Sequence, residues 1–138
     1  MKTNFKILSS TELVYQRYHI DLHNNFRFSR FDYNIQERTM SIHLIKLDGD
    51  WLKDYELDNI AFIHKNVAYL NIHYINPLEY PQDDQTLDFI SYFPMQDRNI
   101  NNGFITKSTP DEDDDILYNF QNEQFIRINC EEIEMLTF

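Results

Sequence analysis

The fold is decided by the stretch Asn59-Ile-Ala-Phe-Ile-His-Lys-Asn-Val-Ala-Tyr-Leu-Asn-Ile-His-Tyr-Ile-Asn76. Residues 60–63 are all apolar, so both faces of a strand there are apolar, which is typical of a central strand. Residues 70–74 alternate between apolar and polar side chains, which indicates a strand with one buried face. The polar break between them, at Lys65 and Asn66, is short enough for an antiparallel turn. The stretch therefore predicts two antiparallel strands at the heart of a sheet.

Two segments before this pair predict a second hairpin. Residues 39–47 alternate well, whereas residues 26–33 alternate with a slip between Phe28 and Phe31. A β-bulge near Ser29 explains the slip, because one extra residue in a strand shifts the phase of the side chains. We expect this hairpin to form the first half of the sheet.

The C-terminal half of the chain adds further predicted strands. Residues 87–93 read as a strand that ends before Pro94, since proline cannot donate a hydrogen bond to a neighbouring strand. Residues 116–120 and 125–130 predict a closing hairpin, and residues 133–138 predict a last edge strand.

Helix signals are few. Residues 9–16 contain Ser-Ser-Thr-Glu, which resembles a helix N-cap, although Val14 and Tyr15 also suit a strand. Residues 51–58 fit either a short helix or the start of the next strand. Together the patterns predict a single domain over residues 1–138, of the α+β class leaning towards all-β. We expect an antiparallel sheet of about seven or eight strands, with at most one or two short helices.

The single cysteine, Cys130, excludes an intramolecular disulfide, which fits a reducing compartment. It follows Ile126 and Ile128 in the period of a strand, so we expect a buried structural thiol and not a nucleophile. The first ten residues lack the apolar run of a signal peptide, and no stretch approaches the roughly 18 apolar residues of a membrane span. We therefore expect a soluble, cytoplasmic protein.

The net charge of −11 is unevenly distributed. Residues 1–47 carry 7 basic and 4 acidic side chains, whereas residues 48–138 carry 5 basic and 19 acidic side chains. Such a field repels nucleic acids and membrane surfaces and attracts basic partners. We therefore expect a basic protein partner, no nucleic acid and no membrane. The alternative is that the charge serves solubility alone, because most surface charge has no dedicated partner.

The densest charge run is Asp111-Glu112-Asp113-Asp114-Asp115. It lacks the glycine and the later glutamate of an EF-hand loop, so calcium binding has little support. Neighbouring carboxylates repel one another, which favours an exposed loop. That loop is either simply solvated or a docking element for Lys or Arg on a partner, where complementary charge raises the association rate. The candidate partner-binding residues are Asp83, Asp84, Asp111, Glu112, Asp113, Asp114 and Asp115.

The spacing of His19, Asp21 and His23 is the pattern most suggestive of a metal site. On a strand, residues i, i+2 and i+4 share one face, so two imidazoles and a carboxylate would supply three ligands to Zn²⁺ or another transition metal. No second set of ligands is evident in the sequence. The alternative is an ordinary polar face of an edge strand or loop.

No motif in the chain argues for catalysis. There is no glycine-rich phosphate loop, no serine nucleophile elbow and no carboxylate pair at a catalytic spacing. Residues 27–31, Arg-Phe-Ser-Arg-Phe, interleave basic and aromatic side chains as RNA-binding strands do, but they also fit an ordinary sheet, and the acidity of the chain argues against RNA. We expect a protein that is not an enzyme and that needs no cofactor.

A longer pattern joins several of these segments. It consists of His19-Ile20-Asp21, Phe31-Asp32-Tyr33, Met40-Ser41-Ile42-His43-Leu44, Ile60-Ala61-Phe62, Asn66-Val67 and Leu70-Asn71-Ile72. It resembles small strand-rich proteins in the immunity families of bacterial polymorphic-toxin systems, where a His-Asp pair precedes a hairpin and a Phe…Asn-Val…Leu-x-Ile pair follows. Here Ile20 splits the His-Asp pair, and the pattern covers about half of the chain. The resemblance implies a cytoplasmic, non-enzymatic protein that binds and neutralises a cognate toxin.

Three functions follow from the sequence. The first is an acidic immunity or inhibitor protein that binds a basic toxin directly. The second is a metal-binding protein or metal-dependent enzyme centred on His19, Asp21 and His23. The third is a structural or assembly subunit, such as a homodimer formed through an exposed edge strand.

Overall fold

The computed structural model describes residues 1–52, 55–73, 85–121 and 123–138. The described residues form one short α-helix and twelve strands, so the strand-rich expectation is confirmed. The strands are divided among three sheets, which corrects the prediction of one sheet of seven or eight strands. In chain order the elements are β1 (Lys2–Thr3), β2 (Lys6–Ile7), β3 (Glu12–Tyr15), β4 (Tyr18–Asp21), α1 (Leu22–Asn25), β5 (Phe26–Asn34), β6 (Thr39–Lys46), the 3₁₀ helix η1 (Asp50–Leu52), β7 (Asn59–Lys65), β8 (Tyr69–His73), β9 (Leu87–Pro94), the 3₁₀ helix η3 (Met95–Asp97), β10 (Asp114–Phe120), β11 (Phe125–Asn129) and β12 (Glu132–Thr137).

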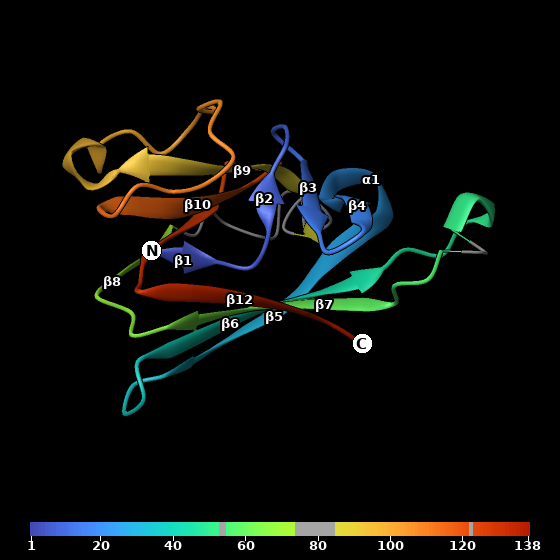
Figure 1. The fold of residues 1–138 in the computed structure, drawn as a ribbon, viewed down its shortest axis with the longest axis horizontal. Helices are drawn as coiled ribbons and strands as arrows, with labels where there is room; N and C mark the ends of the chain where they lie inside the picture. Colours follow the sequence, from blue (N-terminus) through green and yellow to red (C-terminus); the bar gives the residue numbers. More distant parts are fainter. Residues whose placement is uncertain (53–54, 74–84, 122) are drawn as a thin grey trace.

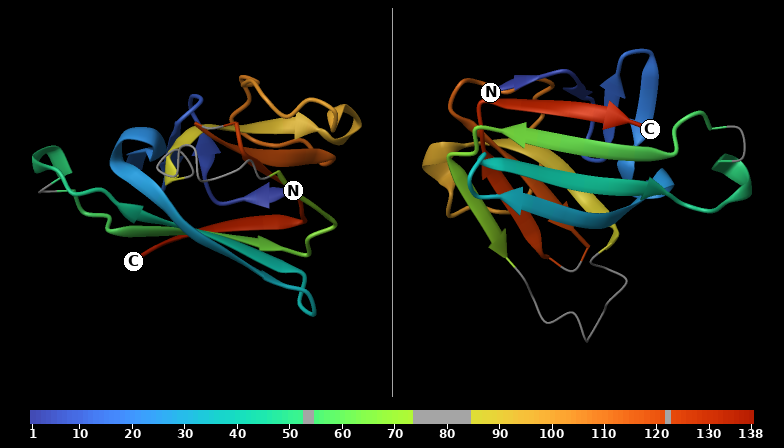
Figure 2. Two further views of the ribbon diagram at one scale, coloured as in Figure 1. Left: turned by 180° about the vertical axis from the view of Figure 1, so that it is seen from behind. Right: turned by 90° about the horizontal axis from the view of Figure 1, so that it is seen from below.

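The two larger sheets form the layers of a sandwich (Figure 1). One layer has the strand order β1-β12-β7-β6-β5, with β7 in the middle as its apolar faces predicted. The other layer has the order β8-β11-β10-β9, and its β10–β11 pair is the predicted closing hairpin. Among these pairs only β1 and β12 run parallel. The view from below in Figure 2 shows the strands of one layer crossing those of the other.

A third sheet, β2-β3-β4, packs with α1 beside the two layers. Of the two alternatives for residues 9–16, a helix or a strand, the strand is confirmed, because this segment contains β3. Leu13 and Tyr15 are buried while the alternating residues Glu12 and Val14 are partly exposed, which is the period of a strand. Buried apolar side chains of all three sheets belong to one hydrophobic cluster.

The predicted antiparallel pairing of the two strands within residues 59–76 is wrong, since β7 and β8 belong to different layers. Residues 74–76 of this stretch lie outside the described residues. Asn66 adopts a left-handed conformation with φ of 55°, and Val67 donates its backbone N–H to the carbonyl of Arg38. The chain thus leaves one layer and enters the other. The link from β11 to β12 crosses beside it, because Ala68 N–H binds the carbonyl of Asn129. A short polar break predicts a turn but does not reveal whether the next strand stays in the same sheet.

The predicted bulge near Ser29 is confirmed. The β5–β6 pairing shifts register between Phe28 and Arg30. Phe28 lies opposite Leu44 and Phe31 lies opposite Ile42, so both aromatic side chains share the inner face of the sheet. In a regular strand, two residues three positions apart face opposite sides, so the bulge is what places both rings on the inner face.

The predicted edge strand at the C-terminal end lies inside its sheet. β12 pairs with β7 on one side and with β1 on the other. The first of these pairs continues past the strand, because Asn59 and Phe138 exchange two backbone hydrogen bonds. The short parallel strand at Lys2 and Thr3 carried too few residues to show a pattern in the sequence.

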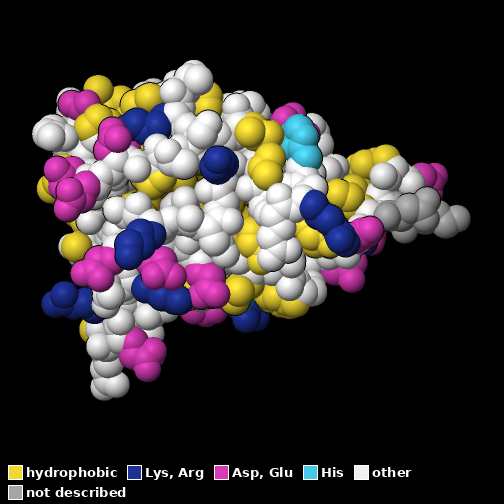
Figure 3. All heavy atoms as spheres, in the orientation of Figure 1, with side chains coloured by type: hydrophobic (Ala, Val, Ile, Leu, Met, Phe, Trp, Pro, Cys, Tyr) yellow, Lys and Arg dark blue, Asp and Glu magenta, His cyan; other side chains and the backbone are white. Residues whose placement is uncertain are grey.

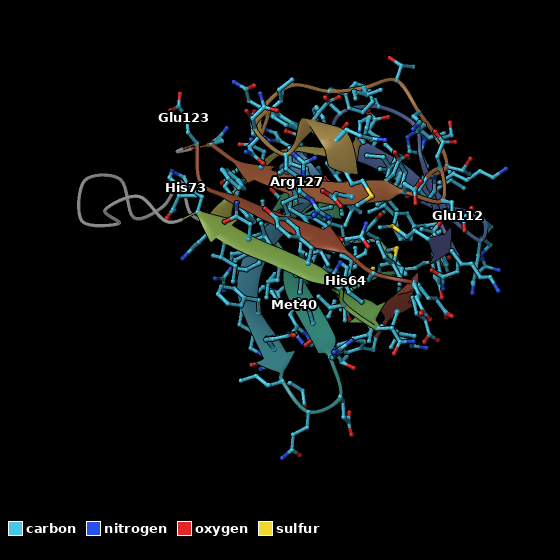
Figure 4. All side chains as sticks on the ribbon, turned by 90° about the vertical axis from the view of Figure 1, so that its left-hand side faces the viewer. Met40, His64, His73, Glu112, Glu123 and Arg127 are labelled. Carbon is cyan, nitrogen blue, oxygen red and sulfur yellow. The ribbon has the colours of Figure 1, made fainter. Side chains whose placement is uncertain are left out.

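A buried histidine connects the two layers. His64 of β7 accepts a hydrogen bond from the hydroxyl of Tyr118 of β10 at 2.8 Å and donates one to the carbonyl of Met40 at 2.7 Å. The carbonyl can only accept, so Nδ1 carries a proton, and the lowered pKa of the ring leaves Nε2 unprotonated at neutral pH. Burial lowers the pKa of His64 to about 4, against a smaller opposite effect of the Met40 carbonyl. Figure 4 shows His64 and Met40 on neighbouring strands of one layer.

Candidate protein-binding surface

The fold divides the acidic run Asp111–Asp115 between the surface and the interior. Its first three side chains are exposed, whereas Asp114 and Asp115 are buried at the start of β10. The expectation of an exposed loop through Asp115 is therefore wrong for the last two residues. Each of them meets basic side chains in the folded chain, which makes burial of the carboxylates tolerable.

Asp115 is the centre of a charge network on the outer face of the β8-β11-β10-β9 layer. Its carboxylate accepts hydrogen bonds from Arg127 at 2.7 Å, from Arg98 at 2.9 and 3.0 Å, and from Asn129 at 3.0 Å. Burial raises the pKa of the Asp115 carboxyl, but these donors outweigh burial and hold it below its ordinary value. The side chain is therefore a buried carboxylate anion at neutral pH.

Arg127 of β11 is fully buried and uses its guanidinium to hold the segment that follows β9. Besides Asp115, it donates to the backbone carbonyls of Ile100 at 2.6 Å, Pro94 at 3.0 Å and Asp97 at 3.2 Å. A buried charge is costly unless it is paired and hydrogen-bonded, and both conditions hold here. In Figure 4 Arg127 lies over the orange strands of this layer.

Asp114 anchors the loop that carries the exposed acidic side chains. Its carboxylate accepts a hydrogen bond from Lys107 Nζ at 2.6 Å and from the backbone N–H of Asp111 at 2.8 Å. Lys107 also contacts the carboxylate of Asp111 at 2.7 Å. The base of the loop is thus fixed by charge-assisted hydrogen bonds, and the residues between Asp111 and Asp114 project outward from it.

We define the acidic rim as Glu112, Asp113 and Glu131, which are exposed. The ammonium of Met1 lies 3.4 Å from the carbonyl of Glu112, and the backbone N–H of Lys2 donates to the carbonyl of Glu131 at 2.8 Å. The three acidic residues are therefore neighbours around the start of β1. Within the described part of the chain, none of their carboxylates forms an ion pair with a Lys, Arg or His side chain.

The surrounding surface is also acidic. Figure 3 shows acidic side chains, interspersed with a few Lys and Arg, on the side of the molecule where Figure 1 places the N-terminus. Glu112 lies at the periphery in Figure 4. The other two predicted partner-binding residues, Asp83 and Asp84, lie outside the described residues.

The structure separates the three residues of the predicted metal pattern. β4 ends at Asp21, whose carboxylate caps α1 by accepting from the backbone N–H groups of His23 and Asn24 at 3.0 Å. The i, i+2, i+4 spacing of a strand therefore does not extend to His23. The His23 ring contacts the carbonyl of Leu87 at 2.7 Å instead.

His19 has a different partner again. Its ring lies 2.8 Å from the carboxylate of Glu12 on the surface of the third sheet. Among the residues that the structure describes, no group of three or more His, Cys, Asp or Glu side chains is arranged to hold a metal ion. The cysteine prediction is confirmed, because Cys130 is buried and its surroundings raise the pKa of the thiol to about 12, mainly through burial.

The residues that support this surface from the interior were not predicted from the sequence. Arg127 lies between Ile126 and Ile128 in a strand predicted to be buried, and a guanidinium there requires a carboxylate partner. The acidic run preceding the partner strand was the available signal, because the hairpin brings the two together. Arg98 and His64 carried no comparable signal, since their partners come from distant segments.

Comparisons with known protein families, with curated protein sequences and with solved structures found no match for this chain. No helix within the described ranges has both the length and the apolar character that crossing a membrane requires. The function is therefore argued from the chemistry of the surface itself.

Proposed function

We propose that this chain is a non-catalytic binding protein, of the immunity or inhibitor kind, that neutralises a basic protein partner by direct contact at the acidic rim. The division of the acidic run carries the proposal. The buried carboxylates of Asp114 and Asp115 are paired with basic side chains, whereas among the described residues no Lys, Arg or His side chain forms an ion pair with the exposed Glu112 or Asp113.

The physical advantage of such a surface is fast and selective association. Complementary charge steers a basic partner towards an acidic patch and suppresses acidic competitors. The net charge of −11 adds a long-range attraction for any basic protein, and the rim supplies the local contact. A loop fixed at its base also loses less conformational freedom on binding than a mobile one.

The resemblance to immunity families of polymorphic-toxin systems supports the same proposal, and so does the absence of a catalytic motif from the sequence. The cognate partner would then be a toxin with a basic surface. A cytoplasmic location belongs to this proposal, because the only cysteine is a buried free thiol.

The test compares two variants with the same net charge. Glu112→Gln with Asp113→Asn neutralises two rim residues, whereas Asp48→Asn with Asp88→Asn neutralises two exposed residues elsewhere. Each variant and the native chain serve as bait in the native lysate at low salt, followed by a graded salt wash and mass spectrometry. We expect the native chain and the control to recover the same basic protein in stoichiometric amount, and the rim variant to lose it at lower salt.

Kinetics with the recovered partner complete the test. At low salt we expect the association rate constant of the rim variant to be at least about threefold lower than that of the native chain, and to depend less on salt. The reason is that electrostatic steering acts mainly on the association rate. Equal rates for the rim variant and the control would remove the rim from the mechanism. Recovery of the bait alone would contradict the inhibitor function.

A further inference from the structure

β5 is a long edge strand with an unpaired side. It spans nine residues and pairs with β6 only, as far as the described residues are concerned. From Ser29 to Asn34 every residue is exposed. An edge of this length presents a row of unsatisfied N–H and C=O groups, which is a template for another strand.

The exposed part of β5 is aromatic on its inner face. Phe31 and Tyr33 lie opposite the buried Ile42 and Met40 of β6, yet they are 38% and 40% exposed. The hairpin extends beyond the covering layer, as Figure 2 shows. Two large rings on the core-facing side of an edge strand are thus left only partly covered.

A groove lies beside the same edge, between the two layers. It has a volume of about 390 Å³. Apolar residues from both sheets, among them Phe28, Phe31 and Ile72, make up half of its lining, and polar residues that include Arg27 and Arg30 make up the rest. Phe28 packs edge-on against Phe120 across the layers, with ring centroids 5.0 Å apart. The apolar inner face is therefore continuous from the core to this edge.

The charged residues of β5 are arranged so that two copies of the strand, paired antiparallel, place opposite charges across from each other. Arg30 and Asp32 lie on the outer face of the strand, two residues apart, and form an exposed ion pair at 3.2 Å. In an antiparallel pair about a two-fold axis at Phe31, Arg30 lies opposite Asp32 of the second copy, and Asp32 opposite its Arg30. An axis at Arg30 or at Asp32 would set like charges directly opposite each other, which is unfavourable.

From these observations we propose that the chain forms a symmetric homodimer through antiparallel pairing of β5 with β5 of a second copy, about a two-fold axis at Phe31. The pairing joins the two five-stranded layers into one continuous sheet. Phe31 meets its equivalent on the inner face, and Tyr33 lies opposite Ser29 of the other copy. Because the contact uses the same edge of each copy, it closes on itself and leaves no β5 edge for further growth.

The dimer is independent of the proposed inhibitor function. The acidic rim surrounds β1, and β1 and β5 are the two opposite edges of the same sheet. A second copy paired along β5 therefore leaves the rim of each copy accessible. Loss of the dimer and loss of partner binding are separate outcomes.

A charge-swap experiment tests both the surface and the register. The full-length native chain, Arg30→Asp and Asp32→Arg are each measured by size-exclusion chromatography with light scattering over a range of concentrations. We expect the native chain to have twice the mass of one chain and each single variant to be monomeric, because like charges then face each other across the axis. Mixing the two variants restores the dimer, since the two carboxylates of one copy then lie opposite the two guanidinium groups of the other.

Matched controls separate the register from a general effect of charge. Arg17→Asp and Asp88→Arg carry the same changes at exposed positions away from β5, and both are expected to stay dimeric. A native chain that is monomeric at every concentration would overturn the proposal, as would single variants that remain dimeric. If the mixture of the two single variants stays monomeric, the register at Phe31 is wrong and the proposal fails.

Discussion

At the scale of single residues, two buried polar side chains depend on specific partners. His64 links the layers as a neutral ring between Tyr118 and the Met40 carbonyl. Asp115 is an anion held by Arg98 and Arg127. The contacts of His64 require a neutral ring, and those of Asp115 require an ionised carboxylate. Both groups therefore lose their contribution to stability in acid, but over different ranges of pH.

We expect His64 to make stability depend on pH between about 4 and 6.5. The pKa of His64 is about 4 in the folded chain and about 6.5 in an unfolded chain, so the unfolded state binds more protons in this interval. The free energy of unfolding therefore rises with pH through the interval, by roughly 3 kcal/mol in total, and levels off above it. Urea unfolding across this range measures the slope.

His64→Gln removes the titrating group and keeps an amide that can donate to the Met40 carbonyl, so the slope should largely disappear. His19→Gln is the matched control, because His19 is exposed and its loss should leave the slope in place. A slope that persists unchanged in His64→Gln would show that another group titrates.

Asp115→Asn should cost about 3–5 kcal/mol, because it leaves the buried Arg127 without its anion. Asp113→Asn, the exposed control in the same run, should change stability by less than about 0.5 kcal/mol. Since the pKa of Asp115 is held below its ordinary value, its contribution is complete above about pH 4 and is lost as the pH falls through the lower folded value. If urea unfolding gave the two variants equal free energies of unfolding, Asp115 would not contribute to stability as proposed.

At the scale of elements, the sequence predicted where the strands lie better than it predicted which strands pair with each other. Apolar patterns located β5, β6, β7, β9, β10 and β11, because the burial of its faces is a property of each strand alone. β6 alternates in burial, whereas β7 and β10 carry buried side chains on both faces. The patterns failed for the partner of β7 and for the position of β12, because the side-chain pattern records which face is buried and not which strand lies beside it. The ion pair between Asp115 and Arg98 was hidden for the same reason, since Arg98 lies outside the predicted hairpin and reaches Asp115 through a tertiary contact.

The bulge in β5 offers a test of how the side chains of this strand are kept on their faces. Deleting Ser29 would remove the extra residue, so Phe28 and Phe31 would alternate directly and stay opposite Leu44 and Ile42. We expect the free energy of unfolding to change by less than about 1 kcal/mol, because no buried side chain changes face. Deleting Arg27, where the pairing is regular, would turn the buried Phe26 to the outer face and should cost roughly 3 kcal/mol or more. Urea unfolding that finds the two deletion variants equally stable would mean that the bulge does not set the phase.

At the scale of the whole molecule, the five-stranded layer has two edges of different character. The β1 edge adjoins the acidic rim, and the β5 edge carries aromatic rings with one self-complementary charge pair. In our two proposals the first edge adjoins the contact with a basic partner, and the second pairs with another copy of the chain. The charge-swap variants at β5 should therefore still capture the basic partner, and the rim variant should still be a dimer.

The position of β12 between β1 and β7 has a consequence for synthesis. On the ribosome, β7 emerges well before residues 132–137, and it keeps an open side until they leave the exit tunnel. β1, although it emerges first, has no strand to pair with during that time. The nascent chain therefore holds a three-stranded remnant of this layer, β5, β6 and β7, whose apolar inner face must be kept from aggregation until β12 arrives.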